Sequence, residues 1–189
     1  MSLPANIKRS AWVEGDYRYS LIREWDETRP WLVIIMHNPS WADALKDDPT
    51  LLRCMHFANL WGFGRIEVVN PFAFRSPHPK ALLVAADPIG PKNDLAISLA
   101  LARTTGFALV GEKRVRVPDV LLAWGQPASK KLYDRIWTVE AMCRRPVAKL
   151  TVCLGRTKAG WPKHPLARGV HRVPNDQKPI FYDGLARAA

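Results

Sequence analysis

The stretch Trp31-Leu-Val-Ile-Ile-Met-His-Asn-Pro-Ser40 decides the fold, because a continuous apolar run stops there abruptly at polar residues. Such a run, rich in β-branched residues, predicts a strand that is buried on both faces, as in a parallel sheet. Similar runs occupy residues 65–70, 119–124 and 149–154, and each is followed by Pro or Gly. We therefore expect these runs to form four parallel strands.

The segments between these runs have helical character. Asp48 and Pro49 form a start signal for one helix, Asn93 or Asp94 can cap a second, and Pro127 suits the first turn of a third. The expected helices span residues 50–61, 93–103 and 128–143. This alternation predicts an α/β fold of three layers, with a mainly parallel four-stranded central sheet between helices.

Two further segments interrupt the alternation. Residues 107–110 and 114–117 predict a hairpin that turns at Gly111, and the proline-rich residues 71–91 predict a long ordered loop. The length of 189 residues suits one domain spanning residues 1–189.

Several classes of protein are disfavoured by composition. No apolar run approaches the roughly 18 residues of a membrane span, and the N-terminus lacks the apolar core of a signal peptide. Cys54, Cys143 and Cys153 are widely spaced and odd in number, so they predict neither a disulfide framework nor a metal knuckle. We therefore expect a cytoplasmic protein.

The basic charge is concentrated in the second half of the chain. Residues 1–94 hold 11 basic and 11 acidic residues, whereas residues 95–189 hold 17 and 6, so the whole excess of +11 lies there. No acid occurs between Ala141 and Asn175. This pattern is typical of a nucleic-acid partner, although a plain basic surface would also produce it. The expected contacts to a nucleic-acid backbone are Arg156, Lys158, Lys163 and Arg168.

Polar and aromatic residues follow the strands, and ligands of open parallel α/β sheets bind beyond the carboxyl ends of the strands. Amides, aromatic rings, imidazoles and cations there predict a pocket for a nucleobase or nucleotide. The residues concerned are His37, Asn38, Pro39, Ser40, Trp41, Asn70, Phe72, Arg75, Trp124, Gly125 and His164.

Each of these residues also has an ordinary interpretation. Asn38 and Asn70 can simply start turns, Trp41 and Phe72 can belong to the core, and His164 can be a loop residue. Asp47-Asp48 most simply precedes a helix start, with a catalytic or metal role as the alternative. The histidines show no metal-binding spacing, and phosphate-loop, dinucleotide and hydrolase motifs are missing, so we expect no metal and no organic cofactor.

The motifs resemble those of the DUF1643 family, over roughly residues 17–170. The matching segments are Arg18-Tyr-Ser-Leu21, Met36-His-Asn-Pro-Ser40, Asp47-Asp-Pro-Thr50, Val68-Val-Asn-Pro-Phe-Ala-Phe-Arg75, Asp87-Pro-Ile-Gly-Pro-Lys-Asn-Asp94, Ala123-Trp-Gly125 and His164-Pro-Leu166. The family usually has an aliphatic residue at the position of His37 and Leu at that of Pro71.

The order of motifs is also similar to that of the uracil-DNA glycosylase superfamily. That resemblance implies that Asn38 positions an attacking water and that Trp41 stacks on a flipped base. It implies that Asn70 hydrogen-bonds to the edge of a pyrimidine and that His164 stabilises the departing base anion. The expected function is therefore action on a base or nucleotide in DNA. The alternatives are a non-catalytic nucleic-acid-binding module and an enzyme that acts on a free small molecule.

Overall fold

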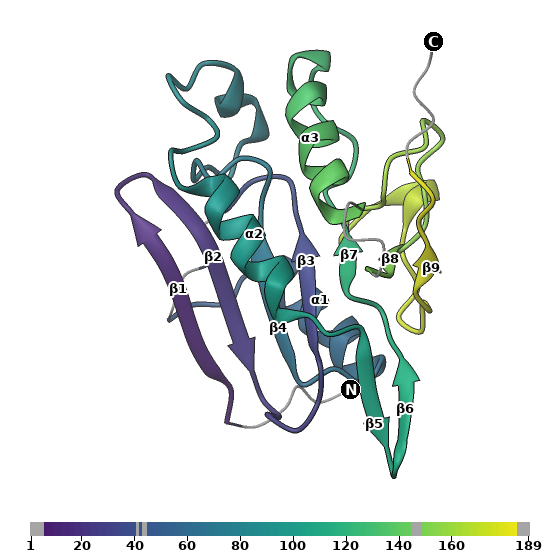
Figure 1. Cartoon of the computed structure of the whole chain (residues 1–189). Helices are drawn as coiled ribbons and strands as arrows, with labels where there is room; N and C mark the ends of the chain where they lie inside the picture. Colours follow the sequence, from purple (N-terminus) through teal and green to yellow (C-terminus); the bar gives the residue numbers. More distant parts are fainter. Residues whose placement is uncertain (1–5, 41, 43–44, 145–148, 185–189) are drawn as a thin grey trace.

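Four parallel strands form the centre of the sheet in the computed structural model, which describes residues 6–40, 42, 45–144 and 149–184 (Figure 1). They are β3 (Trp31–Ile35), β4 (Arg65–Val69), β7 (Val120–Leu122) and β8 (Thr151–Cys153), and they lie side by side in the order β4-β3-β7-β8. All their residues are buried except Trp31 and Arg65, as expected for strands covered on both faces. The α/β class and these four strands are confirmed.

The described sheet is larger than the four strands that were expected, because antiparallel strands extend both of its edges. One edge carries β1 (Lys8–Glu14) and β2 (Tyr17–Glu24), with β2 paired to β4, and the other carries β9 (Ile180–Phe181). The four-strand prediction missed β2 because Arg18, Ser20 and Arg23 interrupt its apolar residues, although all three are buried.

Helices cover both faces of the sheet (Figure 1). Helix α1 (Pro49–Leu60) packs on one face against side chains such as Leu32 and Ile66. Helices α2 (Asn93–Arg103) and α3 (Tyr133–Arg144) pack on the other face against Val33 and Leu122. Short 3₁₀ turns occupy Pro79–Leu83, Lys130–Leu132 and Gly169–His171.

The expected starts of α1 and α2 agree with the structure to within one residue, whereas the expected cap is confirmed for α1 alone. Asp48 caps α1, because its side chain accepts a hydrogen bond from the amide of Leu51. Asn93 was wrongly expected to cap α2: it lies inside the helix, is fully buried, and donates to the carbonyls of Asn70 and Pro71. Helix α3 starts at Tyr133 rather than near residue 128, because a 3₁₀ turn precedes it.

The predicted hairpin is present as β5 (Phe107–Val110) and β6 (Lys113–Arg116), which form a separate two-stranded sheet. It projects beyond the end of the main sheet at which β7 begins (Figure 1). The cysteines are free and buried. Within the described ranges, no helix combines the length and the apolar character that a membrane crossing requires.

Candidate functional site

A cavity of about 460 Å³ lies where the connections after β3 and β7 diverge. The chain leaves β3 toward α1 and leaves β7 toward α3, so the two connections pass to opposite faces of the sheet. This is the position at which open α/β sheets bind their ligands. The polar or aromatic side chains that line the cavity are Arg18, His37, Asn38, Ser40, Asp48, Thr50, Ser76, Trp124, Gln126 and His164.

Asn38 fixes the protonation of His37. The amide nitrogen of Asn38 donates to the carbonyls of Ser76 (2.8 Å) and Pro39 (3.2 Å), so its Oδ1 is the atom 3.2 Å from Nδ1 of His37. Because an amide oxygen only accepts, Nδ1 of His37 must donate. In the neutral ring Nε2 is then an acceptor, and it has no hydrogen-bond partner among the described residues.

The tautomer of His164 is the opposite one. The backbone N–H of Leu166 donates to its Nδ1 over 3.1 Å, so in the neutral ring the proton lies on Nε2. Burial lowers the pKa of His164, and the charge of His37 lowers it further, although Asp48 opposes both effects. Burial also lowers the pKa of His37. Both rings are therefore neutral near pH 7; the Nε2 of His164 carries a proton, whereas the unprotonated Nε2 of His37 is buried.

The loop after β7 approaches the loop that carries His164. Gly125 has φ +74°, donates to the carbonyl of Pro162, and lies so close to His164 that an added Cβ would come within 3.3 Å of the histidine Cβ. Glycine meets both requirements of this contact, the left-handed backbone and the short approach. Trp124 forms part of the cavity wall and is 2% exposed.

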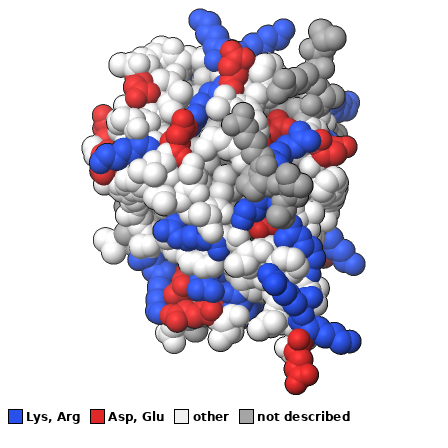
Figure 2. Space-filling model, viewed as in Figure 1, with Lys and Arg blue, Asp and Glu red and all other residues white. Residues whose placement is uncertain are grey.

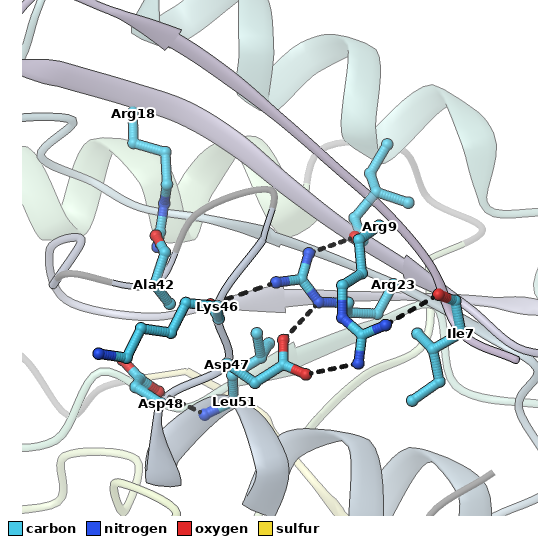
Figure 3. Close-up of polar contacts among 10 residues, drawn as sticks. Ile7, Arg9, Arg18, Arg23, Ala42, Lys46, Asp47, Asp48 and Leu51 are labelled. Carbon is cyan, nitrogen blue, oxygen red and sulfur yellow. Dashed lines mark hydrogen bonds and ion pairs between the residues drawn. The ribbon is translucent and has the colours of Figure 1, made fainter. Parts of the chain in front are cut away.

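Two neighbouring aspartates anchor the segment between β3 and α1 (Figure 3). Asp47 accepts from Nε of Arg23 at 2.7 Å and pairs with Nη2 of Arg9 at 3.1 Å, while Asp48 caps the helix. The side chain of Arg23 is fully buried. Capping is therefore confirmed for Asp48, whereas Asp47 binds two arginines of the edge hairpin β1–β2.

Residues 173–177, which we call the strap, cross the outer side of α1. Arg53 donates to the carbonyls of Val173 and Pro174 and to the side chain of Asn175. His56 contacts the Asn175 carbonyl at 2.8 Å, and the Trp61 indole donates to that of Gln177 at 2.9 Å. These bonds hold the strap against α1, and the strap follows His164 and Leu166 in the chain.

Residues 70–75, which directly follow β4, do not line the cavity. Asn70 is 1% exposed, and its Oδ1 accepts from Nη2 of Arg18 (3.4 Å), so Arg18 lies where Asn70 was expected. Phe72 is a core residue packed against the ring of His37 at 5.5 Å. Arg75 follows on the same connection and is half-buried. Trp41 lies outside the described residues.

Sequence reasoning overlooked lining residues from three places. Ser76, Pro77 and Pro79 come from the proline-rich loop, Thr50 from the first turn of α1, and Arg18 from β2. The bond from Asn38 to the Ser76 carbonyl brings the loop to the cavity, and no local sequence pattern indicates a contact over that separation. His37, Asn38, Ser40, Trp124 and His164 were expected at the site and do lie around the cavity.

The basic residues expected at a nucleic-acid backbone differ in their surroundings. Lys158 and Arg168 are exposed, and Lys163 lies along Gly155. Arg156 pairs with Asp183, donates to the Gly184 carbonyl, and lies over the Tyr182 ring. On the face that carries α2 and α3, basic and acidic side chains are mixed, and basic ones predominate toward the hairpin (Figure 2). Within the part of the chain that the structure describes, no group of three His, Cys, Asp or Glu residues is arranged to hold a metal ion.

A family match covers most of the chain. Residues 18–166 match the family described as protein of unknown function (DUF1643). The chain belongs to the DUF1643 family. The first and last residues of the match, Arg18 and Leu166, are also the first and last residues that line the cavity, so the DUF1643 region contains all of its described wall. No curated protein and no solved structure matches this DUF1643 protein.

Proposed function

We propose that this DUF1643 protein binds a nucleobase, within DNA or as a nucleotide, in the cavity and hydrolyses the bond between base and sugar. The observation that carries the proposal is the Nε2–H of the neutral His164 ring in one cavity with the oriented amide of Asn38. A base edge presents donors and acceptors side by side, and the His164 imidazole offers a donor to one of those acceptors.

The proposed chemistry assigns a separate task to each of three side chains. The Nε2–H of His164 donates to the base oxygen on which negative charge develops as the glycosidic bond breaks. A preorganised donor of this kind typically contributes roughly 10²–10³ in rate. The Nδ1–H of His37 orients the Asn38 amide, because it donates to Oδ1. The Oδ1 of Asn38 retains a lone pair with which it can hold the attacking water.

Trp124 is the described aromatic residue best placed to contact the face of the base, since it lines the cavity and lies next to the Gly125–His164 contact. Asn70 is not assigned to the base edge, because Arg18 lies between it and the cavity.

The experiment is a screen for release of free base, using single- and double-stranded DNA with modified bases together with free nucleosides and nucleotides. His164→Gln and Asn38→Ala should each lower turnover by about 10²-fold or more with binding retained. His171→Gln is the matched control, because it removes an imidazole from the same C-terminal segment outside the cavity wall. Binding without turnover on every substrate would support a non-catalytic binding module instead.

The second candidate is an enzyme that acts on a free nucleotide and not on DNA, and the engagement of Arg156 favours this form of the substrate. That guanidinium is already paired with Asp183 and the Gly184 carbonyl, so fewer of the expected cations face a phosphate backbone. The salt dependence of DNA binding separates the two candidates. Contacts from Lys158, Lys163 and Arg168 would give a slope of log K against log salt near −0.9 for each phosphate neutralised. A flat dependence with intact nucleoside binding would favour the free ligand.

A further inference from the structure

The cavity has an inner part whose wall belongs to the hydrophobic core. Leu21 of β2 and Val68 of β4 line it from the sheet, and Leu51 and Cys54 line it from the first turns of α1. Met36 completes this wall at the end of β3. These five side chains are between 1% and 6% exposed, and we call them the inner wall.

The inner wall offers almost no hydrogen bonds. Four of its side chains are hydrocarbon or thioether groups, and burial raises the pKa of the Cys54 thiol to about 12, so that it stays uncharged at neutral pH. Arg18 also lines the cavity, and it is held by the carbonyl of Ala42 at 2.8 Å and by Asn70. A polar group placed against the inner wall would lose its bonds to water, whereas an apolar group would gain from burial.

The polar side chains of the cavity come from other segments. His37, Asn38 and His164 belong to the loops beyond the strands, whereas the inner wall lies between the sheet and α1. The ligand that matches such a cavity is amphipathic, with a hydrogen-bonding edge at His164 and Asn38 and an apolar group against the core. An unsubstituted pyrimidine has the edge but lacks the apolar group.

We propose that the ligand of this cavity is a nucleobase with an apolar substituent, and that the substituent contacts Leu21, Met36, Leu51, Cys54 and Val68. This proposal rests on the proposed function, because it takes the nucleobase from there and adds the class of modification. It makes the inner wall the determinant of specificity and leaves the chemistry to the imidazoles and Asn38.

The test is a calorimetric series on the unmodified protein. The probes are 2′-deoxyuridine and 2′-deoxycytidine with hydrogen, methyl, ethyl, propyl or butyl groups, placed at C5 of the uridine and at N4 of the cytidine. The affinity should rise about fourfold for each added carbon in at least one series, until the inner part is filled.

Two results overturn the proposal, and they differ in what they leave standing. If the unsubstituted nucleosides bind and the affinity is flat or falls along both series, the apolar substituent is wrong while the proposed function stands. If no member of either series binds, the proposed function fails and takes this proposal with it.

Two variants at one position add an independent measurement. Cys54→Leu reduces the inner space and should shift the preferred substituent to a shorter one, whereas Cys54→Ala enlarges the space and should shift it to a longer one. The same optimum in both variants would overturn the assignment of the substituent to the inner wall. Should either variant fail to fold, the series on the unmodified protein still decides.

Discussion

The residues directly after β3 and directly after β4 begin side by side and reach different surroundings. The two strands are parallel neighbours with Ile35 paired to Val69, so the residues that follow each strand leave the same edge of the sheet. His37 and Asn38 line the cavity, whereas Asn70 and Phe72 are buried outside its wall. A residue that directly follows a parallel strand therefore does not necessarily line the cavity.

The difference arises from the neighbours of each strand. Beside β3 lies β7, whose following connection turns to the opposite face, and the cavity forms between the two connections. Beside β4 lies the antiparallel β2, whose Arg18 donates its amide to the Ala73 carbonyl and its guanidinium to Asn70. The antiparallel strand β2 thus covers residues 70–73, the first residues after β4.

The largest expected effect tests whether the β4 connection serves stability. Phe72→Ala should lower the free energy of unfolding by about 3–5 kcal/mol, because it removes a 2% exposed ring from the core. Urea denaturation followed by circular dichroism measures the change. Ser40→Ala after β3 is the control, and we expect a loss below about 1 kcal/mol. Equal losses would abolish the distinction between the two connections.

The next effect concerns the anchor of the β3 connection. Asp47→Ala leaves the fully buried Arg23 side chain without its carboxylate and should cost about 3 kcal/mol. Glu14→Ala breaks the ion pair with Lys92, whose side chain is 48% exposed, and should cost far less, because exposed ion pairs contribute little to stability. Differential scanning calorimetry compares the two variants, and an equally mild Asp47→Ala would show that Arg9 and Arg23 do not need this partner.

The sequence predicts the central strands well and the edges poorly. The runs that became β3, β4, β7 and β8 are apolar because both faces are buried, and burial of this kind is visible locally. In β2 the polar side chains of Arg18 and Arg23 are buried as well, and their partners Asn70 and Asp47 lie far along the chain. A local pattern contains no information about such partners.

The residues of the site, like the strands, could be predicted from the sequence only in part. His37, Asn38 and His164 were placed correctly at the cavity, because residues after parallel strands share one edge. The exclusion of Asn70 and the inclusion of Ser76 depend on contacts made by Arg18 and Asn38 across the fold. The roles of these residues in binding or catalysis remain predictions.

A smaller effect is expected where the β7 connection meets His164. Gly125→Ala combines a left-handed backbone with a Cβ placed 3.3 Å from His164, so we expect about 1–2 kcal/mol of destabilisation. Nucleoside affinity should fall at the same time because the imidazole moves. Gly160→Ala is the matched control, since φ there is +83° and an added Cβ meets nothing within 4 Å. Loss of affinity in both variants would indicate backbone strain rather than displacement of His164.

The smallest expected effect is the pH dependence of the free energy of unfolding that the two cavity imidazoles cause. Burial lowers the folded-state pKa of His37 and His164 below the ordinary value of about 6.5. The unfolded chain then binds protons before the folded one, so the free energy of unfolding should fall as pH decreases from about 6.5 toward the lowered values. Urea melts at pH 7.5 and 5.5 measure this slope.

The double variant His37→Gln and His164→Gln should flatten that slope, and His171→Gln should leave it unchanged. An unaltered slope in the double variant would mean that both imidazoles titrate normally in the folded state. That outcome would also remove the argument that both rings are neutral near pH 7.

The strap has a practical consequence for spectroscopy. The indole of Trp61 donates to the Gln177 carbonyl, so the environment of this chromophore changes whenever residues 173–177 leave α1. With the other tryptophans replaced by phenylalanine, the emission of Trp61 would report the docking of the C-terminal segment in real time. Stopped-flow traces of this signal would time the docking of the strap on α1 during refolding.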